Sequence, residues 1–464
     1  MGEERETIVL GEEVKMQYQI LNYSTTMQDD GTFRLDAEHY QEQFLMNQER
    51  LIRFGSTPLL KLISQQVKTG HTPSMKIESY YGGDISFVKT DNLRDFKISG
   101  EFSHYLSKSG NEIIKRSALK NDDLIVTIIG ATQKIVGRAA LVRKENLPAN
   151  INQNIALIRL KKQYSPEFLS AYLNCKIGRL AVWYLSRQTE QVNLNCREIE
   201  KVLVPNISDV FVSSIEDIYK KAVACEHDSR SAYKKAQNFL LSELGLSNWQ
   251  PKHQLTFIKN YSNGHDELGN LVSIRKCIEV GSDEYLNEGI PFIRVSDLSS
   301  FELTEEKYIS KELYFELAQH QPKKGEILLS KDATPGIAYF LRENSRKMIP
   351  SGGILRLKLK DNRLNEDYLT LVLNSLIVKE QINRDVGGSV ILHWRPDQIK
   401  ETLIPILPKT DQGKIKEKII HSFELRKQSK HLLDSAKHAV EIAIEQDEGA
   451  AIKWLEEQTE SRKH

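Results

Sequence analysis

The sequence has few cysteines, no strong net charge and no long hydrophobic run. Four cysteines in 464 residues, none in a C-x-x-C pair, argue against a disulfide framework and predict a reducing, cytoplasmic setting. Basic and acidic residues nearly cancel, giving a net charge of +1, so no global field marks a nucleic-acid binder. No window approaches about 20 apolar residues, and the acidic start is unlike a signal peptide. We therefore expect a protein that neither spans a membrane nor is exported.

Motifs of the common catalytic and nucleotide-binding sites are also missing. The sequence has no H-E-x-x-H, no P-loop, no G-x-S-x-G and no G-x-G-x-x-G between a strand and a helix. His265, Asp266 and Asp332 are interpreted as isolated polar residues in surface loops. Residues 122–123 form an Asp pair, but Asp is common in turns, and the matching positions 325–326 hold Gly-Glu. We predict no catalytic residue, no metal site and no cofactor.

What the chain does contain is a long internal repeat. The segment REIEKVLVP at 197–205 returns 200 positions later as DQIKETLIP at 397–405. Two further pairs of segments match in the same order, namely 166–169 with 366–369 and 85–89 with 290–294. A period this long indicates duplicated domains rather than a solenoid of short repeats.

Each copy has the pattern of a mixed globular domain. Short apolar, β-branched runs predict strands over 124–129 and 155–160 in the first copy, and over 325–330 and 354–359 in the second. A helix is predicted to begin at Pro166 and, in the second copy, after Asn365. Pro205 and Pro408 end the two globular segments.

A helical spacing of three and four residues follows each domain. The seams consist mostly of Ala, Ser and aliphatic residues: Ile215, Ile218, Ala222, Cys225, Ser229, Ala232, Ala236 and Phe239, then Ile415, Ile419, Ser422, Ser429, Leu433, Ala436, Val440 and Ala443. This is a coiled-coil period. Two arrangements are open: each helix packs on its own domain, or the two helices pair antiparallel as a spacer roughly 50 Å long.

Basic residues gather in a few glycine-containing segments. Residues 131–144 carry four cations and no acid before Glu145, and 341–360 carry six cations against one acid. Residues 187–193 (RQTEQVN) are rich in amides, and 387–393 match them in position. Cations suit phosphates, and Gln, Asn and Arg suit base edges. Solvated surface loops remain the alternative.

At these residues the chain resembles the specificity subunits of type I restriction-modification enzymes. The motifs that carry the resemblance are RLDAEHY at 34–40, TGHTP at 69–73, ISFV at 85–88 with DNL at 91–93, GRAA at 137–140, NQNI at 152–155, QVN at 191–193 and IEKVLVP at 199–205. The second copy departs from them: SGG at 351–353 replaces 152–154, and Ile391 and His393 replace Gln191 and Asn193.

The resemblance implies an α+β fold with two tandem target recognition domains, separated by two long antiparallel coiled-coil helices and related by a pseudo-two-fold axis. The expected boundaries are 1–207 for the first recognition domain with an N-terminal extension, 208–246 for the first spacer helix, 247–408 for the second recognition domain, and 409–464 for the second spacer helix and tail.

The resemblance also implies a non-catalytic reader of a bipartite, asymmetric site in double-stranded DNA. Its expected partners are two methyltransferase subunits, which bring S-adenosylmethionine and flip an adenine, and restriction subunits. The absence of an N/D-P-P-Y/F tetrad argues against methylation by this chain itself. A structural adaptor that uses only its helices, or a module of a methylation-only or type II system, remains the alternative.

The residues expected to contact DNA lie in the motifs and basic segments of both copies. In the first copy they are Lys68, Thr69, His71, Lys89, Thr90, Gln133, Lys134, Arg138, Asn152, Gln153, Arg187, Gln188, Gln191 and Asn193. In the second copy they are Arg294, Ser296, Lys331, Arg342, Ser351, Ser389, His393 and Arg395. The differences between the copies predict two unlike half-sites.

Overall fold

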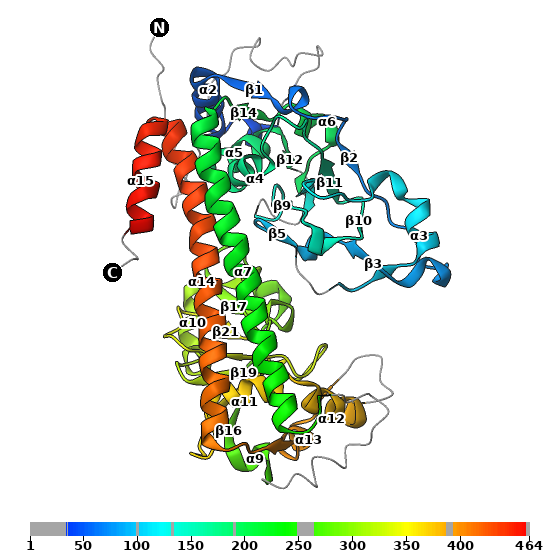
Figure 1. Cartoon of the computed structure of the whole chain (residues 1–464), viewed down its shortest axis with the longest axis vertical. Coiled ribbons are helices and arrows are strands. Elements are labelled where there is room, and N and C mark those ends of the chain that lie inside the picture. The colour runs from blue at the N-terminus through cyan, green and yellow to red at the C-terminus, as the bar shows by residue number, and fades with distance from the viewer. Residues whose placement is uncertain are drawn as a thin grey trace, which may run out of the picture. The chain divides into compact units, whose positions relative to one another are not determined.

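The computed structural model describes residues 34, 36–98, 102–130, 134–188, 192–247, 264–386 and 393–460. Contacts divide the chain into two compact units, unit 1 (1–222 with 430–464) and unit 2 (223–429). Both units mix helix and sheet, as predicted (Figure 1). The division falls within the two long helices, so each helix contributes to both units. The four expected segment boundaries therefore remain a prediction.

Unit 1 is built on short strands. Its four-stranded sheet has the order β2 (Lys68–Thr69), β11 (Ile155–Ile158), β7 (Leu124–Thr127) and β9 (Ala139–Leu141). Smaller sheets are β10 (Ala149–Ile151), β3 (Tyr81–Val88), β6 (Tyr105–Leu106); β12 (Arg187–Gln188), β13 (Val192–Asn193), β8 (Ile129–Gly130); β1 (Ser56–Pro58), β14 (Leu203–Pro205); and β4 (Leu93–Arg94), β5 (Lys97–Ile98). The strands predicted from the apolar runs are confirmed as β7 and β11, whose residues are all buried.

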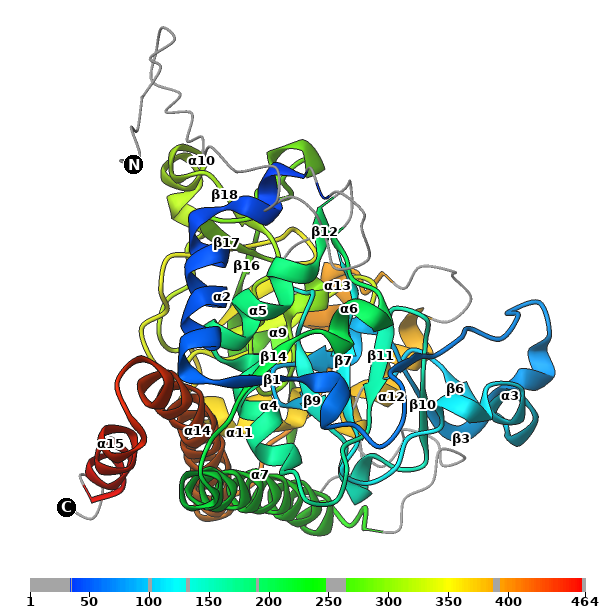
Figure 2. The ribbon, with the colours of Figure 1, turned by 90° about the horizontal axis from the view of Figure 1, so that it is seen from above.

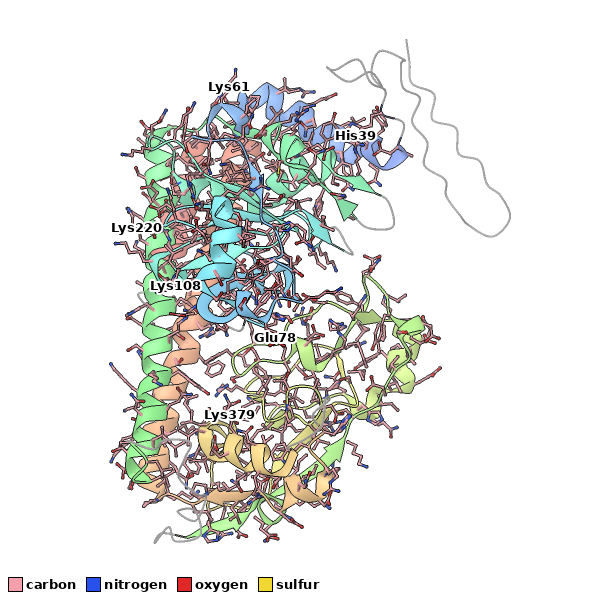
Figure 3. The ribbon with its side chains drawn as sticks, turned by 90° about the vertical axis from the view of Figure 1, so that its right-hand side faces the viewer. His39, Lys61, Glu78, Lys108, Lys220 and Lys379 are labelled. Atoms are coloured by element: carbon pink, nitrogen blue, oxygen red, sulfur yellow. The ribbon has the colours of Figure 1, made fainter. Side chains whose placement is uncertain are left out.

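Helices cover these sheets. They are α2 (Glu42–Phe54), α3 (Lys108–Ile113), α4 (Pro166–Asn174), α5 (Lys176–Leu185) and α6 (Cys196–Glu200). The side chain of Ser165 accepts a hydrogen bond from the Phe168 amide, which explains why α4 begins at the predicted Pro166. Helix α2 packs against α5 (Figure 2). Lys108 and Glu78 mark the lobe formed by α3 and the turn before β3 (Figure 3).

Unit 2 repeats this plan. Its sheets are β16 (Val272–Lys276), β22 (Ile354–Leu359), β19 (Glu326–Ser330), β20 (Ala338–Phe340); β18 (Tyr308–Ile309), β17 (Ile290–Ile293), β21 (Ile349–Pro350); and β15 (His265–Glu267), β23 (Leu403–Pro405). Its helices are α9 (Leu268–Leu271), α10 (Lys311–Glu316), α11 (Glu366–Leu373), α12 (Leu376–Val386) and α13 (Pro396–Lys400). The predicted strands over 325–330 and 354–359 are confirmed as β19 and β22.

The two units share strand order and pairing sense. The order β2-β11-β7-β9 corresponds to β16-β22-β19-β20, and both sheets are antiparallel. In each unit one parallel pair, β3 with β10 or β17 with β21, adjoins an antiparallel neighbour. The sequence repeat is therefore also a repeat of topology. One prediction is wrong: His265 and Asp266 lie in strand β15, and Asp266 accepts hydrogen bonds from Asn270 and Arg363.

An asparagine makes the same contacts in both units. Oδ1 of Asn174 accepts from the Ala139 amide at 3.2 Å, and its Nδ2 donates to the Ala139 carbonyl at 2.8 Å. Asn374 makes the same pair of bonds to Ala338, at 3.0 and 2.8 Å. Each side chain thus satisfies the backbone of an edge strand, β9 or β20, as another strand would.

A carboxylate–arginine pair lies on or beside the two central strands of each main sheet. Arg159 binds both oxygens of Asp123 at 2.6 Å, and Arg356 binds both oxygens of Glu326 at 2.9 and 3.0 Å. The sequence prediction that the Asp pair is not conserved as a pair holds. However, its second carboxylate, Asp123, is matched by Glu326, and each of these acids binds an arginine on or next to the neighbouring strand.

Two long helices follow the two domains, α7 (Asp209–Glu243, 35 residues) and α14 (Lys409–Glu445, 37 residues). Within unit 2, the hydroxyls of Ser229 and Ser422 each donate to the other residue's carbonyl, at 2.8 and 2.7 Å. Arg426 contacts Glu226 at 3.3 Å, whereas Lys414 lies over the Phe239 ring. Residue numbers increase along α7 while those of their contacts on α14 decrease. The two helix segments therefore pair antiparallel within this unit.

Most residues of the predicted helical seams are buried, whereas Cys225, Phe239 and Leu433 are half-buried. Small residues on them, among them Ala222, Ser229, Ala236 and Ser422, are fully buried, which lets the backbones approach closely. A second, shorter helix, α15 (Glu448–Glu460), follows α14, and its first residue binds the Ser208 amide at 3.0 Å within unit 1. Among the described residues, no helix combines the length and apolar character needed to cross a bilayer.

All four cysteines are unpaired. Burial raises the pKa of the Cys175 and Cys277 thiols to about 12, because a thiolate is poorly solvated there. These thiols are therefore protonated at neutral pH.

We predict that Glu326→Ala lowers the free energy of unfolding by about 3–5 kcal/mol, because it leaves the buried Arg356 guanidinium without its partner. Side-chain exposure is 2% for Arg356 and 4% for Glu326. Asp123→Ala, whose partner Arg159 is 23% exposed, is the matched control and should cost less. Urea unfolding of the full chain measures both, and equal effects would contradict the prediction.

The Glu326–Arg356 pair also makes the free energy of unfolding depend on pH. Burial acts to raise the pKa of Glu326, but the hydrogen bonds from Arg356 and the Lys323 amide lower it overall. Because the folded pKa lies below the unfolded one, the stabilisation is present at neutral pH and is lost as the pH falls through the acidic range.

Candidate nucleic-acid interface

In unit 1, four segments meet at one end of the main sheet. Thr69 of β2 pairs with Ala156 of β11. The Ile128 amide donates to the Asn154 carbonyl, and the Leu194 amide donates to the Ile128 carbonyl, both at 2.9 Å. We name the described residues 68–72, 128–130, 134–138, 152–154, 187–188 and 192–193 loop cluster 1. Backbone pairing therefore joins segments that are up to 87 residues apart in the chain.

Polar side chains of loop cluster 1 reach solvent. His71, Lys134, Gln153, Arg187 and Asn193 are exposed. Thr72 donates to Gln153 Oε1 at 2.5 Å, and Arg187, 71% exposed, lies 3.3 Å from Glu198. Lys68, Thr69 and Arg138 are half-buried. The structure thus brings together most of the residues predicted for the first copy.

A glycine is required where two of these segments cross. A Cβ atom on Gly70 would lie 1.8 Å from the Ile151 carbonyl oxygen, so no other residue fits without moving the backbone. The crossing places His71 and Thr72 beside residues 152–153, which explains the position of glycine in the TGHTP motif.

Residues of the RLDAEHY motif bind the chain just before residues 187–188 of loop cluster 1. Arg34 pairs with Asp36 and donates to the carbonyls of residues 185 and 186, and His39 Nδ1 donates to the Tyr184 carbonyl at 2.6 Å. Burial, together with the Arg34 charge, lowers the pKa of His39 to about 4, so the ring is neutral and must donate from Nδ1. These contacts fix the chain immediately before Arg187 (His39 is labelled in Figure 3).

Lys89 and Thr90 lie next to the cluster. The Val88 carbonyl accepts from the Asn152 amide at 3.1 Å. Lys89 Nζ donates to His104 Nδ1 at 2.9 Å, and burial followed by the Lys89 charge lowers the pKa of His104. The Thr90 hydroxyl is buried without a hydrogen-bond partner among the described residues. Asn152 is buried and accepts from the Asn154 amide, so its side chain shapes the turn.

Unit 2 has the corresponding cluster with different side chains. The Lys331 amide donates to the Gly353 carbonyl at 2.9 Å, and the Trp394 amide donates to the Lys331 carbonyl at 2.8 Å. Lys331 therefore occupies the place of Ile128. We name residues 331–336, 351–353 and 393–395 loop cluster 2.

A charged group lies at the centre of loop cluster 2. Asp332 Oδ1 accepts from His393 Nδ1 at 2.8 Å, and Asp332 Oδ2 pairs with the Lys331 ammonium. Burial acts to raise the pKa of Asp332, but hydrogen bonds from Lys331 and His393 lower it overall. The interpretation of Asp332 as an isolated surface residue is therefore wrong.

The other predicted residues of the second copy divide into two groups. Ser296 and Arg395 are exposed. Ser351 is buried, and Arg294 binds Asp297 at 3.0 Å as part of its own turn.

Gln133, Gln191 and Ser389 lie outside the described residues, as does the side chain of Gln188. A DNA contact by any of these residues remains a prediction.

Arg342 holds the second domain to a long helix. It donates to Asp367 of α11 at 2.5 Å, and its guanidinium lies 3.8 Å from the centre of the Phe423 ring on α14. Phe301 packs against Phe423 and against Tyr233 of α7, with ring centres 6.2 and 4.6 Å apart. We name this arrangement the aromatic clamp of unit 2.

Unit 1 has an equivalent clamp. Arg143 binds Glu167 of α4 at 2.8 Å and lies 5.2 Å from the centre of the Tyr219 ring on α7. Phe96 contacts the Tyr219 ring, and Lys437 of α14 lies over the Phe96 ring. Basic residues of the predicted stretches 131–144 and 341–360 thus include two arginines that dock a domain onto a helix.

Known proteins resemble this chain over its second copy and, in one case, over most of its length. Residues 266–431 match the family model described as the type I restriction modification DNA specificity domain. The chain is 24% identical over 167 residues to the EcoBI specificity subunit of Escherichia coli, covering 34% of each chain. It is 25% identical over 379 residues to the MjaIX specificity subunit of Methanocaldococcus jannaschii, covering 74% of this chain and 81% of the relative. The resemblance predicted from the motifs is confirmed.

Solved structures give a weaker likeness. The S subunit from M. genitalium has a TM-score of 0.37 at 14% identity, covering 84% of this chain and 94% of that chain. The subunit from Thermoanaerobacter tengcongensis has a TM-score of 0.30 at 15% identity, covering 85% and 97%. TM-scores below 0.5 do not establish a common overall arrangement. The match to the EcoBI subunit spans about a third of that relative's length.

We predict that Arg342→Ala destabilises unit 2 by roughly 3 kcal/mol, because it leaves the buried Asp367 carboxylate unpaired. Asp367 is 5% exposed. Arg395→Ala is the control, since Arg395 is exposed and lies 4.0 Å from an exposed Asp397, and it should leave stability unchanged. Thermal unfolding of the two variants separates them, and equal midpoints would refute a structural role for Arg342.

Proposed function

We propose that this chain, which belongs to the family of type I restriction-modification specificity subunits, reads double-stranded DNA and makes or breaks no covalent bond itself. The observation that carries the proposal is the pair of loop clusters, which have one backbone plan and two sets of side chains. Such loops on a rigid scaffold are typical of recognition surfaces.

The chemistry of loop cluster 1 suits a base edge flanked by phosphates. Asn193 and Gln153 offer amides, which pair bidentately with adenine, whereas Lys134 and Arg187 offer cations. Loop cluster 2 offers His393 and Lys331 with one carboxylate between them. Because the two clusters differ, each would recognise a different half of a split, asymmetric site.

The long helices supply the spacing in this proposal. At 1.5 Å per residue, helices of 35 and 37 residues are about 50 Å long, which exceeds one DNA turn of about 34 Å. We propose that they pair as an antiparallel coiled coil along their length and relate the two domains by a pseudo-two-fold axis. The antiparallel contacts in unit 2 and the clamp in each unit support this arrangement.

Partners complete the proposed complex. The family implies two methyltransferase subunits, which bring S-adenosylmethionine and flip the target adenine, and restriction subunits that join this core. The net charge of +1 supports such sharing, because tight DNA binding needs several cations near phosphates. Much of that neutralisation would come from the partners.

We expect Asn193→Ala to impair recognition of one half-site only. Loss of a bidentate base contact costs about 1–3 kcal/mol, or about 5- to 150-fold in Kd, at a single base position. His393→Ala, at the equivalent position of unit 2, is the matched variant and should affect the other half-site. Binding of the chain with its methyltransferase subunits to DNA substituted one position at a time measures both. Equal weakening on every sequence would instead mean contacts to phosphate.

The spacing proposal predicts a change in gap length. Seven residues inserted into both α7 and α14 preserve the heptad phase and add about 10 Å, equal to the rise of about three base pairs. The preferred gap between half-sites should lengthen by up to that amount, as measured by selection from DNA with randomised gap lengths. An insertion in α7 alone is the control and should disrupt pairing. An unchanged gap preference in the double insertion would disconnect the helices from spacing.

A further inference from the structure

We infer that Asp332 is a positioning residue that sets which hydrogen-bonding group His393 presents to a base in the second half-site. This inference rests on the proposed function. Asp332 belongs to no sequence motif and was not among the residues predicted to contact DNA.

The hydrogen bond determines the tautomer of His393. An ionised carboxylate only accepts, so the Nδ1 atom that lies 2.8 Å from Asp332 Oδ1 must carry a hydrogen. The lowered pKa of Asp332 keeps that carboxylate ionised at neutral pH. In the neutral ring Nε2 is then an acceptor. The imidazole is 64% exposed, whereas Asp332 is 25% exposed, so the histidine faces solvent on an anchored carboxylate.

Lys331 holds the other oxygen. Its ammonium pairs with Asp332 Oδ2, and the Lys331 side chain is 21% exposed. The carboxylate therefore cannot rotate freely, because each of its oxygens is bound to a different side chain. Rigid support of this kind is what a specific base contact requires.

The backbone around the group is also fixed. Asp332 and His393 form a β-bridge, and the next residue, Trp394, is 1% exposed in the core of unit 2. The Trp394 amide donates to the Lys331 carbonyl at 2.8 Å, and the Lys331 amide donates to the Gly353 carbonyl at 2.9 Å. His393 thus projects from a position set by the core.

The equivalent bridge of unit 1 carries different side chains. The paired residues at the equivalent bridge are Ile129 and Asn193. An asparagine offers both a donor and an acceptor, whereas the neutral ring of His393, with its Nδ1 hydrogen held by Asp332, offers an acceptor alone at Nε2. In the major groove an acceptor pairs with the exocyclic amino group of cytosine or adenine. We therefore expect one position of the second half-site to require such an amino group.

Asp332→Asn should reverse this preference. Lys331 only donates, so the amide oxygen would turn toward Lys331 and the amide NH2 toward His393. Nδ1 would become the acceptor and Nε2 the donor, because the partner of one ring nitrogen sets the role of the other. The favoured base should then present an acceptor, as guanine and thymine do.

The test measures relative Kd at every base position of both half-sites, using double-stranded DNA and the full chain in complex with its methyltransferase subunits. Wild type, Asp332→Asn, His393→Ala and the double variant are compared, with Asn193→Ala as the control for the other half-site. Asp332→Asn should change the preference at one position of the second half-site by tenfold or more and leave the first half-site unchanged. In the His393→Ala background, Asp332→Asn should have no further effect at that position.

Three results would overturn the inference: Asp332→Asn weakens all sequences equally, its effect persists without His393, or no position changes. If Asp332→Asn lowers the thermal midpoint, His393→Asn, a change at an exposed residue, serves as the second variant. It must then alter the base preference at that same position of the second half-site. A wild-type complex without half-site discrimination would instead refute the proposed function, so the two failures are distinguishable.

Discussion

The stacking of an arginine on an aromatic ring of a long helix is the interaction on which the other features depend. Arg143 and Arg342 each bind a carboxylate of the helix that follows the main sheet, and each covers a ring of α7 or α14. Guanidinium–aromatic contacts that are shielded from water contribute up to about 2 kcal/mol. Because both clamps use the same parts, each domain is docked on a long helix in a defined orientation.

Hydrogen bonds and ion pairs within each unit hold the strands that lead to the loop clusters. Asn174 and Asn374 bind the edge strands β9 and β20, and each carboxylate–arginine pair connects two neighbouring strands of one main sheet. Asn174, Asp123 and the Arg356–Glu326 pair are buried, which suits a role inside the scaffold. The asparagines fix the strand ends that follow residues 134–138 and 331–336, whereas the carboxylate–arginine pairs join central strands of each sheet. Side chains in the clusters can therefore differ between the units while the backbone plan stays the same.

The repeat, the main strands and both long helices were predictable, because each depends on local periodicity or on spacing along the chain. The Asp332–His393 contact was not, since it joins residues 61 positions apart and neither lies in a periodic segment. Arg342 was predicted from local charge to contact DNA. However, its guanidinium group donates a hydrogen bond to Asp367 and stacks on the Phe423 ring. Composition identifies a cation, but only tertiary packing determines whether that cation is available.

Sequencing of methylated bases tests the central claim most directly. In cells that express this chain together with its methyltransferase subunits, the account predicts one modified word made of two unlike halves with a fixed unread gap. A continuous word, or a methylation pattern that does not depend on this chain, would contradict it.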